Sequence, residues 1–186
     1  MKLVLFDIDG TLVDCGGQAR TAFADALTHV MGATGGLAGY DFSGKLDPRI
    51  VVDLLMTMGF SREEAVRRMP DVRAAYLERL ERTLQVDKMK LLPGVAELVD
   101  ALHERDDVAL GLLTGNWEQG GRIKIGRFDL NRYFPFGSFG DDAYDRNDRD
   151  AGRLFFQDGI VCCQTSFNLA LSYVKNFQSS AALSLK

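Results

Sequence analysis

The sequence predicts an α/β protein with a doubly wound parallel sheet, and three observations support this class. Short, continuously apolar runs at residues 2–6 and 108–113 indicate strands buried on both faces. Segments with helical spacing follow each run. Polar residues come directly after both runs, where strands of such sheets present their ligand-binding ends. The order strand, helix, strand, helix, short strand implies parallel pairing.

Helical patterns dominate the chain after the first run. Apolar residues recur at helical spacing over 18–31, which predicts an amphipathic helix, and a glycine-rich loop at 32–44 follows. Asp47 as N-cap and Pro48 at the first helical position predict a second helix, which Gly59 is placed to end.

Two more helices are expected before the second apolar run. Ser61 and Glu64 have the spacing of a capping box, which predicts a third helix. Pro70 is expected to break it, and Asp71 to start a fourth that ends near Gln85. So much helical chain is more than one crossover requires.

The rest of the core pattern lies on both sides of the second apolar run. Helices are expected at 94–104 and 118–128, and a short third strand within 133–140.

Composition excludes several classes of function. The 186 residues are 46% hydrophobic, enough for a real core, and 26 acidic against 22 basic residues disfavour nonspecific nucleic-acid binding. No apolar stretch approaches membrane-spanning length. The three cysteines do not form a spaced disulfide framework, which favours a cytoplasmic protein, and Cys15 is expected to be a small buried side chain rather than a nucleophile.

Two aspartates come directly after the first apolar run. Asp7 and Asp9 are spaced i, i+2, so in an extended chain they lie on one side and can converge on a ligand. Acids in a loop are often only solvated turn residues, but the end of a buried strand favours a functional site.

The stretch Phe6–Val13 (FDIDGTLV) resembles motif I of the haloacid dehalogenase-like hydrolase superfamily, in its phosphatase form. The resemblance implies that Asp7 is a nucleophile that becomes an aspartyl-phosphate. It also implies that Asp9 protonates the leaving oxygen and later activates water. Because two anions must approach each other, a divalent cation is needed; Mg²⁺ is expected at Asp7 and Asp9, the latter through its backbone carbonyl.

The second apolar run ends in Thr114-Gly115-Asn116, which resembles motif II. The resemblance implies that the Thr114 hydroxyl and nearby backbone N–H groups hold phosphoryl oxygens, that Gly115 leaves room for the phosphate, and that Asn116 contacts the substrate or the cap. Gly120–Ile125 resembles the helix after motif II in phosphoglycolate-phosphatase-like members, which implies that Lys124 neutralises the nucleophile and the phosphate. Arg122 and Arg127 are the alternatives on that helix.

The helical insertion after motif I resembles the C1 cap of this superfamily. The expected division is a Rossmann-like core at 1–14 and 88–149, a cap at 15–87, and an atypical segment at 150–186. Phe42–Pro48 resembles the stretch with which such caps contact substrate, so Lys45 is expected to meet a substrate carboxylate or phosphate. The alternative is an ordinary surface lysine.

The resemblance ends near residue 149. Motif IV, whose acids complete the metal site of the superfamily, has no counterpart in 150–186, where only five of the 48 charged residues fall. Asp141, Asp142 and Asp158 are weak candidates to replace it. A core truncated at its last strands would expose apolar surface and favour self-association.

The resemblance implies a Mg²⁺-dependent phosphatase that hydrolyses a small phosphomonoester, similar to phosphoglycolate. Its expected partner is a small phosphorylated metabolite, with no nucleic acid and no membrane. The alternatives are a sugar-phosphate mutase of the same superfamily and a noncatalytic member with an incomplete metal site.

Overall fold

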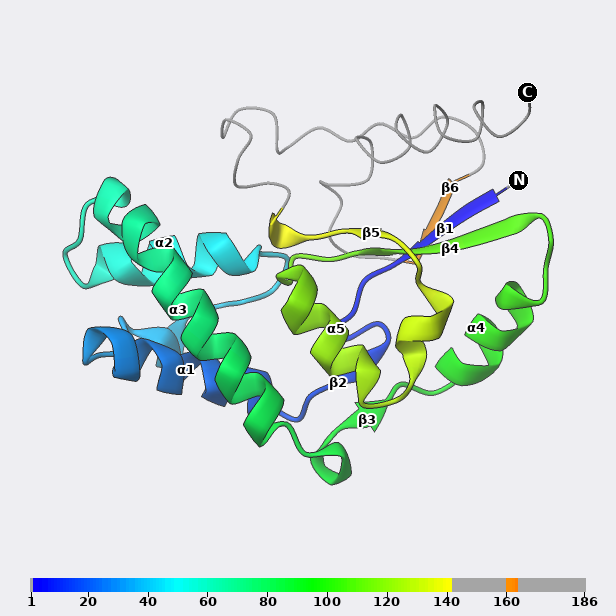
Figure 1. The fold of residues 1–186 in the computed structure, drawn as a ribbon, viewed down its shortest axis with the longest axis horizontal. Coiled ribbons are helices and arrows are strands. Elements are labelled where there is room, and N and C mark those ends of the chain that lie inside the picture. Colours follow the sequence, from blue (N-terminus) through cyan, green and yellow to red (C-terminus); the bar gives the residue numbers. More distant parts are fainter. Residues whose placement is uncertain (1, 142–159, 164–186) are drawn as a thin grey trace.

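A four-stranded parallel sheet forms the centre of the molecule and confirms the predicted α/β class (Figure 1). The computed structural model describes residues 2–141 and 160–163. The strand order is β5-β4-β1-β6, with β1 paired to β4 on one side and to β6 on the other. The strands are β1 (Lys2–Phe6), β4 (Val108–Leu113), β5 (Gly137–Ser138) and β6 (Ile160–Cys163).

The strand order reverses at β1, which fixes where a ligand can bind. The chain passes from β1 to β4 and then outward to β5, whereas β6 lies on the other side of β1. Helices α4 (Val95–His103) and α5 (Glu118–Gly126) lie on the same side of the sheet, below it in Figure 1. In such sheets the crevice outside the carboxyl end of the strand at the reversal is the usual ligand site.

The two main strands are buried as their apolar sequences predict. Val4, Leu5 and Phe6 of β1 are buried, as are the last four residues of β4. β6 was not predicted, and within the described residues it adds a strand beside β1, with Phe6 opposite Cys163.

Strands β2 (Val13–Asp14) and β3 (Lys90–Leu91) pair as a small antiparallel ribbon, and three α-helices lie between them in the sequence. Helices α1 and α2 both pack against α3. The bounds are α1 (Gln18–Met31), α2 (Asp47–Thr57) and α3 (Arg62–Thr83), with short 3₁₀ helices η1 (Leu37–Gly39), η2 (Val86–Lys88) and, after α5, η3 (Leu130–Tyr133).

The expected break at Pro70 is wrong, because α3 runs through it as one helix. A proline in a helix interior costs about 3 kcal/mol, since it removes a hydrogen bond and crowds the preceding turn. Burying large apolar side chains contributes about 1.5–3 kcal/mol each. The buried face of α3 continues on both sides of Pro70, with Met69, Val72 and Tyr76 in contact with the core, and so outweighs the proline.

The expected N-cap role of Asp47 is also wrong. Asp47 is the first residue of α2, and its N-cap is Leu46, whose side chain makes no capping hydrogen bond. The Asp47 carboxylate instead accepts a hydrogen bond from the backbone N–H of Trp117, 70 residues away. The capping box of Ser61 and Glu64 is confirmed at the start of α3.

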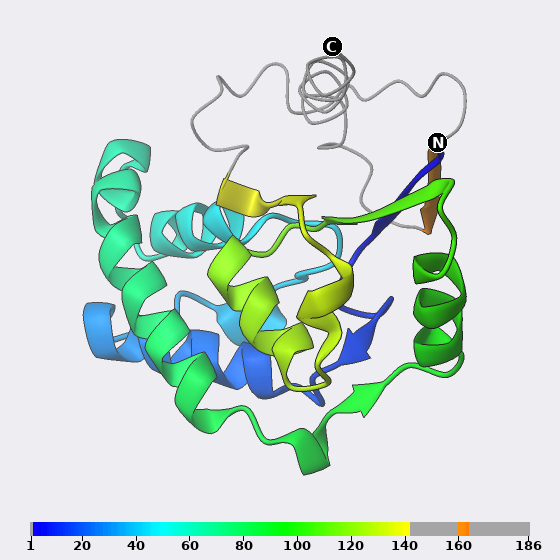
Figure 2. The same ribbon diagram turned by 45° about the vertical axis from the view of Figure 1, so that its right-hand side comes forward.

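An aromatic cluster joins α1 and α3 to the sheet side of the molecule. Phe23 of α1 stacks on Trp117 with ring centroids 6.0 Å apart, and Tyr76 of α3 lies 4.8 Å from Phe23 and 5.7 Å from Trp117. Figure 2 shows in a second view α1 beside α3, and α3 beside α5. The helical segment therefore shares one buried apolar cluster with the core; its division as a cap at 15–87 stays a prediction.

Several expectations fall on parts of the chain that the structure does not describe. Asp142, Asp158 and most of the atypical segment at 150–186 lie outside the described residues. Within 2–141 and 160–163, no helix is both long and apolar enough to cross a membrane. Self-association through exposed apolar surface stays a prediction.

Candidate active site

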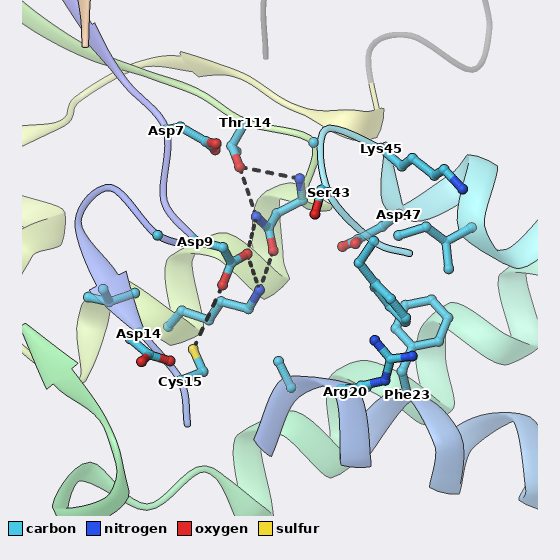
Figure 3. Close-up of a pocket in the computed structure, with 18 of the residues that line it drawn as sticks. Asp7, Asp9, Asp14, Cys15, Arg20, Phe23, Ser43, Lys45, Asp47 and Thr114 are labelled. Atoms are coloured by element: carbon cyan, nitrogen blue, oxygen red, sulfur yellow. Dashed lines mark hydrogen bonds and ion pairs between the residues drawn. The ribbon is translucent and has the colours of Figure 1, made fainter. Parts of the chain in front are cut away.

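A pocket of about 860 Å³ lies at the carboxyl ends of β1 and β4, where the helical segment faces the sheet (Figure 3). The loop after β1 and the loop after β4 form one side, and α1 with the loop before α2 forms the other. Its lining includes all the predicted site residues: Asp7, Asp9, Lys45, Thr114, Gly115, Asn116 and Lys124.

Asp7 lies at the floor of the pocket as a partly buried carboxylate. Burial raises its pKa. This increase is partly offset by hydrogen bonds from the backbone N–H of Ile8 (2.8 Å) and from the Thr114 side chain, which lower the pKa. The nearby negative charge of Asp9 raises the pKa further. The pKa of Asp7 therefore lies above its ordinary value, and a cation bound at this carboxylate would relieve the cost.

Asp9 forms an ion pair with Lys124. The Lys124 ammonium donates to Oδ2 of Asp9 at 2.6 Å, and the Lys124 side chain is 4% exposed whereas that of Asp9 is 47% exposed. Burial alone would raise the pKa of Asp9, but the Lys124 charge and hydrogen bonds from Lys124 and Asn116 lower it. Burial likewise opposes the charge of Lys124, yet Asp9 raises its pKa above the ordinary value. Both groups are therefore ionised near neutral pH.

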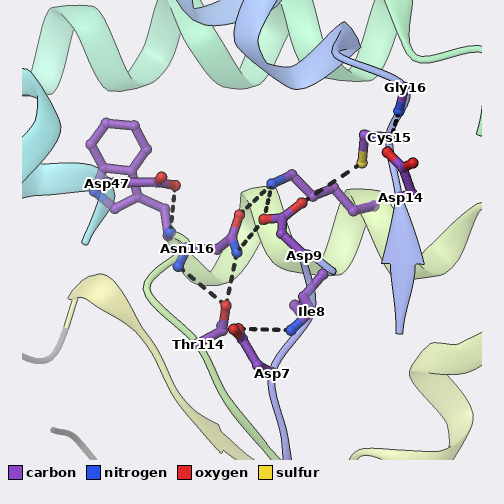
Figure 4. A network of polar contacts seen from close by, with 11 residues as sticks. Asp7, Ile8, Asp9, Asp14, Cys15, Gly16, Asp47, Thr114 and Asn116 are labelled. Carbon is purple, nitrogen blue, oxygen red and sulfur yellow. Dashed lines mark hydrogen bonds and ion pairs between the residues drawn. The ribbon is translucent and has the colours of Figure 1, made fainter. Parts of the chain in front are cut away.

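Asn116 joins the residues of the two loops (Figure 4). Its amide nitrogen donates to Asp9 Oδ2 at 2.9 Å and to the Thr114 hydroxyl at 2.8 Å. Its amide oxygen accepts from Lys124 at 2.6 Å. The sequence left open whether Asn116 contacts substrate or cap; its side chain is the centre of the network that fixes Asp9, Thr114 and Lys124.

The three basic residues of the α5 region differ in what they contact. Lys124 faces the pocket, whereas Arg122 donates to the carbonyl of Phe134 and Arg127 contacts Glu81 of α3. Lys124 was predicted to neutralise the nucleophile. The structure places its ammonium on Asp9, and its charge also lowers the pKa of Asp7, although less than the hydrogen bonds to that carboxyl do.

Cys15 is buried beside the site, as expected of a small apolar side chain. Its thiol lies 3.9 Å from Asp9 Oδ1. Burial raises the pKa of Cys15 to about 11, so the thiol stays protonated at neutral pH. Because the thiolate is the reactive form, Cys15 is not a nucleophile here.

The helical side of the pocket carries two residues that sequence reasoning did not assign to the site, Arg20 and Phe23. Ser43 and Asp47, within the stretch expected to contact substrate, line it as well. The Arg20 guanidinium donates to backbone carbonyls of η1 and Tyr40, so it holds the glycine-rich loop. A partly buried arginine facing a glycine-rich loop has no local signature, since its acceptors are main-chain atoms 17–20 residues along the chain.

Lys45 lines the pocket but is directed away from Asp7 in Figure 3. Its ammonium lies 3.8 Å from the centre of the Tyr40 ring, a cation–π contact. Such a contact holds a surface lysine weakly enough to be exchanged for an anionic ligand.

Asp141, a weak candidate metal ligand, is engaged elsewhere. Its Oδ2 accepts from the backbone N–H of Glu118 at 2.6 Å, at the start of α5, and its Oδ1 pairs with Arg73 of α3 at 2.8 Å. Asp141 therefore stabilises the N-terminus of α5 and links it to the helical segment.

The donor set of the pocket fits Mg²⁺ in part. Asp7 offers a carboxylate whose pKa is raised by burial, and the loop after β1 adds the carbonyl of Asp9. Residues 2–141 and 160–163 contain no cluster of three or more acidic, histidine or cysteine side chains suited to a metal. Mg²⁺ commonly uses one or two carboxylates and keeps several waters, so these oxygens suit it as partial ligands.

Comparisons with known proteins agree with this geometry. A phosphoglycolate phosphatase of Synechococcus elongatus is 32% identical over 139 residues, which cover 72% of this chain and 58% of that protein. The chain thus spans well under two thirds of the length of this relative.

Solved structures match the fold. A hydrolase from Pseudomonas syringae superposes with a TM-score of 0.55 at 23% identity, covering 76% of this chain and 63% of that one. A predicted phosphoglycolate phosphatase from Haemophilus somnus superposes with a TM-score of 0.51 at 22% identity, covering 75% and 63%.

The family match covers the same part of the chain as the motifs. The model of the haloacid dehalogenase-like hydrolases matches residues 1–149, which include both sides of the pocket. With Asp7, Asp9, Thr114 and Lys124 assembled in the expected order along the chain, this protein belongs to the haloacid dehalogenase-like hydrolase family and resembles its phosphoglycolate phosphatase-like members.

Proposed function

We propose that this protein is a phosphatase that hydrolyses a small phosphomonoester through a phosphorylated Asp7. The observation that carries the proposal is that the two carboxylates after β1 have different surroundings. One carboxylate, Asp7, is partly buried and pairs directly with no lysine of residues 2–141, whereas the nearby Asp9 is held by Lys124 and Asn116. Two carboxylates in environments this different are suited to different steps.

In the first step, one bond to phosphorus forms and another breaks. A carboxylate oxygen of Asp7 attacks phosphorus, and the bond from phosphorus to the leaving oxygen breaks. Asp9 supplies the proton that the leaving oxygen takes up. Because Asp9 is ionised in the free protein, it must gain this proton as the anionic substrate binds; the phosphate raises the pKa of Asp9 and competes for the Lys124 ammonium.

The second step restores the protein. Asp9, now ionised, takes a proton from water, and the water oxygen attacks phosphorus and releases the Asp7 carboxylate. The Thr114 hydroxyl and the Lys124 ammonium bind phosphoryl oxygens in both steps. Mg²⁺, when bound at the oxygens of Asp7 and Asp9, supplies positive charge that lets two anions approach.

In this proposal, the residues on the helical side of the pocket select the substrate. Lys45 lines that side and carries a charge suited to the carboxylate of a substrate such as phosphoglycolate, the compound that names the Synechococcus relative. The buried free thiol of Cys15 accords with a reducing, cytoplasmic compartment.

The direct test uses p-nitrophenyl phosphate and phosphoglycolate with purified protein, with and without Mg²⁺. We expect turnover that needs Mg²⁺ and that falls by about 10³-fold or more in Asp7→Asn, because the amide cannot attack phosphorus. Release of inorganic phosphate, rather than transfer to a sugar phosphate, distinguishes hydrolysis from mutase activity. Equal rates for the two proteins, or no turnover by the wild type, would overturn the proposal.

A further inference from the structure

Asp47 forms hydrogen bonds with the main chain on both sides of Asn116. Its backbone N–H donates to the carbonyl of Gly115 at 2.8 Å, and its Oδ2 accepts from the N–H of Trp117 at 2.9 Å. The intervening carbonyl of Asn116 accepts from the N–H of Gly140 at 2.8 Å. One residue of the helical segment therefore fixes the peptide units before and after Asn116.

The contact leaves almost no free space. A Cβ on Gly115 would lie 2.4 Å from the carbonyl oxygen of Lys45, and one on Gly140 would lie 2.4 Å from the carbonyl oxygen of Gly115. Real Cβ contacts are essentially never this short. The loop before α2, the loop after β4 and the end of β5 are thus packed backbone against backbone around Asn116.

The charge of Asp47 is costly where it lies. The residue is 8% exposed. Burial raises its pKa to about 6, although Lys124 and the N–H of Trp117 favour the ionised form; Asp9 and Asp141 raise the pKa further. The position is thus held by hydrogen bonds to the main chain, which outweigh the cost of burying the carboxylate.

We propose that Asp47 is a positioning residue for the reaction: by holding Gly115 and Trp117 it orients the Asn116 amide, which in turn aligns Asp9 and Lys124. The proposal rests on the proposed function, since Asp9 matters as the proton donor. Asp47 acts through Asn116, which contacts Asp9 Oδ2 and Lys124 Nζ directly. The helical segment thereby controls the acid–base group and not only the choice of substrate.

This role predicts an effect that depends on the leaving group. An alkyl phosphate needs the proton from Asp9 as its bond to phosphorus breaks, whereas p-nitrophenolate leaves readily without one. Misalignment of Asp9 should therefore slow an alkyl ester much more than the aryl ester. General loss of structure would lower both rates by the same factor.

The experiment compares Asp47→Ala, Asp47→Asn and the control Asp25→Ala, which alters an exposed residue of α1. For Asp47→Ala we expect kcat to fall about 100-fold with phosphoglycolate and less than about 10-fold with p-nitrophenyl phosphate. Asp47→Asn keeps an oxygen that can accept from Trp117 and should remain within about fivefold of wild type on both esters. Equal losses on both esters, no loss in Asp47→Ala, or an Asp47→Asn variant as slow as Asp47→Ala would overturn the proposal.

A second readout needs no turnover, because Trp117 is the single tryptophan of the chain. In Asp47→Ala, we expect Trp117 emission to shift to longer wavelength and acrylamide quenching to increase, while Asp47→Asn and Asp25→Ala match wild type. If the wild type hydrolyses neither ester, the proposed function fails, yet this measurement still decides whether Asp47 fixes the loop. Unchanged emission and quenching in a folded Asp47→Ala variant would contradict the role of Asp47.

Discussion

The two sides of the pocket are held together in different ways. On the core side, Asp9, Thr114, Asn116 and Lys124 form a continuous hydrogen-bonded network. On the helical side, the lining residues are mostly fixed by apolar packing and by main-chain contacts, as for Phe23 in its aromatic cluster and Arg20 on backbone carbonyls. Asp47 is the residue through which the helical side holds the loop that carries Asn116.

The difference shows how work is divided within the site. A dense polar network places reacting groups accurately and costs little reorganisation during the reaction. Side chains on the helical side can be substituted without displacing the reacting groups, provided that the contact made by Asp47 is kept. This account predicts that substitutions on the core side act on kcat, and that those on the helical side act on kcat only where they reach the Asn116 loop.

The largest effect is expected on the core side, at Lys124. Replacement by methionine keeps the buried aliphatic stem and removes the ammonium that binds Asp9 and Asn116. We expect kcat/KM to fall by about 10²–10³-fold, as for other lost transition-state donors. Without the charge and hydrogen bond of Lys124, the pKa of Asp9 should also rise, so the pH dependence of its proton donation should move to higher pH.

The matched control is Arg127→Met, in the same region but in contact with Glu81 rather than the pocket. Its kcat/KM should stay within about twofold of wild type, because an exposed pair of this kind contributes little. A comparable loss in both variants would contradict the assignment of Lys124.

An intermediate effect is expected from the charge of Asp47. Its folded pKa of about 6 lies above the ordinary 3.8, so ionisation costs stability as pH rises through 6, and the cost is absent below about pH 4. Two pKa units correspond to about 3 kcal/mol. Asp9, with a lowered pKa, has the opposite sign and acts at lower pH.

The measurement is the free energy of unfolding in urea of wild type and Asp47→Asn at pH 4 and pH 7. Wild type should lose up to about 3 kcal/mol relative to Asp47→Asn over this range. Asp7, whose pKa is also raised, changes both proteins alike. A constant difference between the two proteins from pH 4 to pH 7 would show that Asp47 is not a buried carboxylate.

The smallest effect is expected where the two sides touch, at Gly115. Gly115→Ala would drive its methyl group into the Lys45 carbonyl, 2.4 Å away, and we expect a loss of about 1–3 kcal/mol in unfolding free energy. Gly39→Ala is the control, because nothing lies within 4 Å of its added Cβ. Thermal unfolding of both variants checks this; equal stability of the two would mean that the loops do not meet as closely as described.

The sequence predicts the core side of the pocket better than the helical side, for a physical reason. Asp7, Asp9 and Thr114 follow buried strands directly, and parallel strands bring such positions together. Lys124 needed the family resemblance to be distinguished from Arg122 and Arg127, since all three have the same charge on one helical region.

The helical side depends on contacts that local patterns do not contain. Asp47 before a proline suits an N-cap, yet its partner Trp117 is 70 residues away, so the local interpretation was wrong. Likewise, Pro70 signals a helix end locally, whereas packing of α3 against α1 and α2 decides the outcome. In both cases tertiary contacts outweigh the local preference.

The central claim, that Asp7 carries the phosphoryl group, is tested most directly by trapping the intermediate. Asp9→Asn cannot activate water, so the second step should slow more than the first when p-nitrophenyl phosphate, a good leaving group, is the substrate. After acid quench, peptide mass spectrometry should find a phosphoryl group on Asp7 in this variant with Mg²⁺ present, and none in an Asp7→Asn, Asp9→Asn double variant. Phosphorylation of another residue, or turnover by Asp9→Asn with no phosphoryl group on Asp7 at any quench time, would contradict the account.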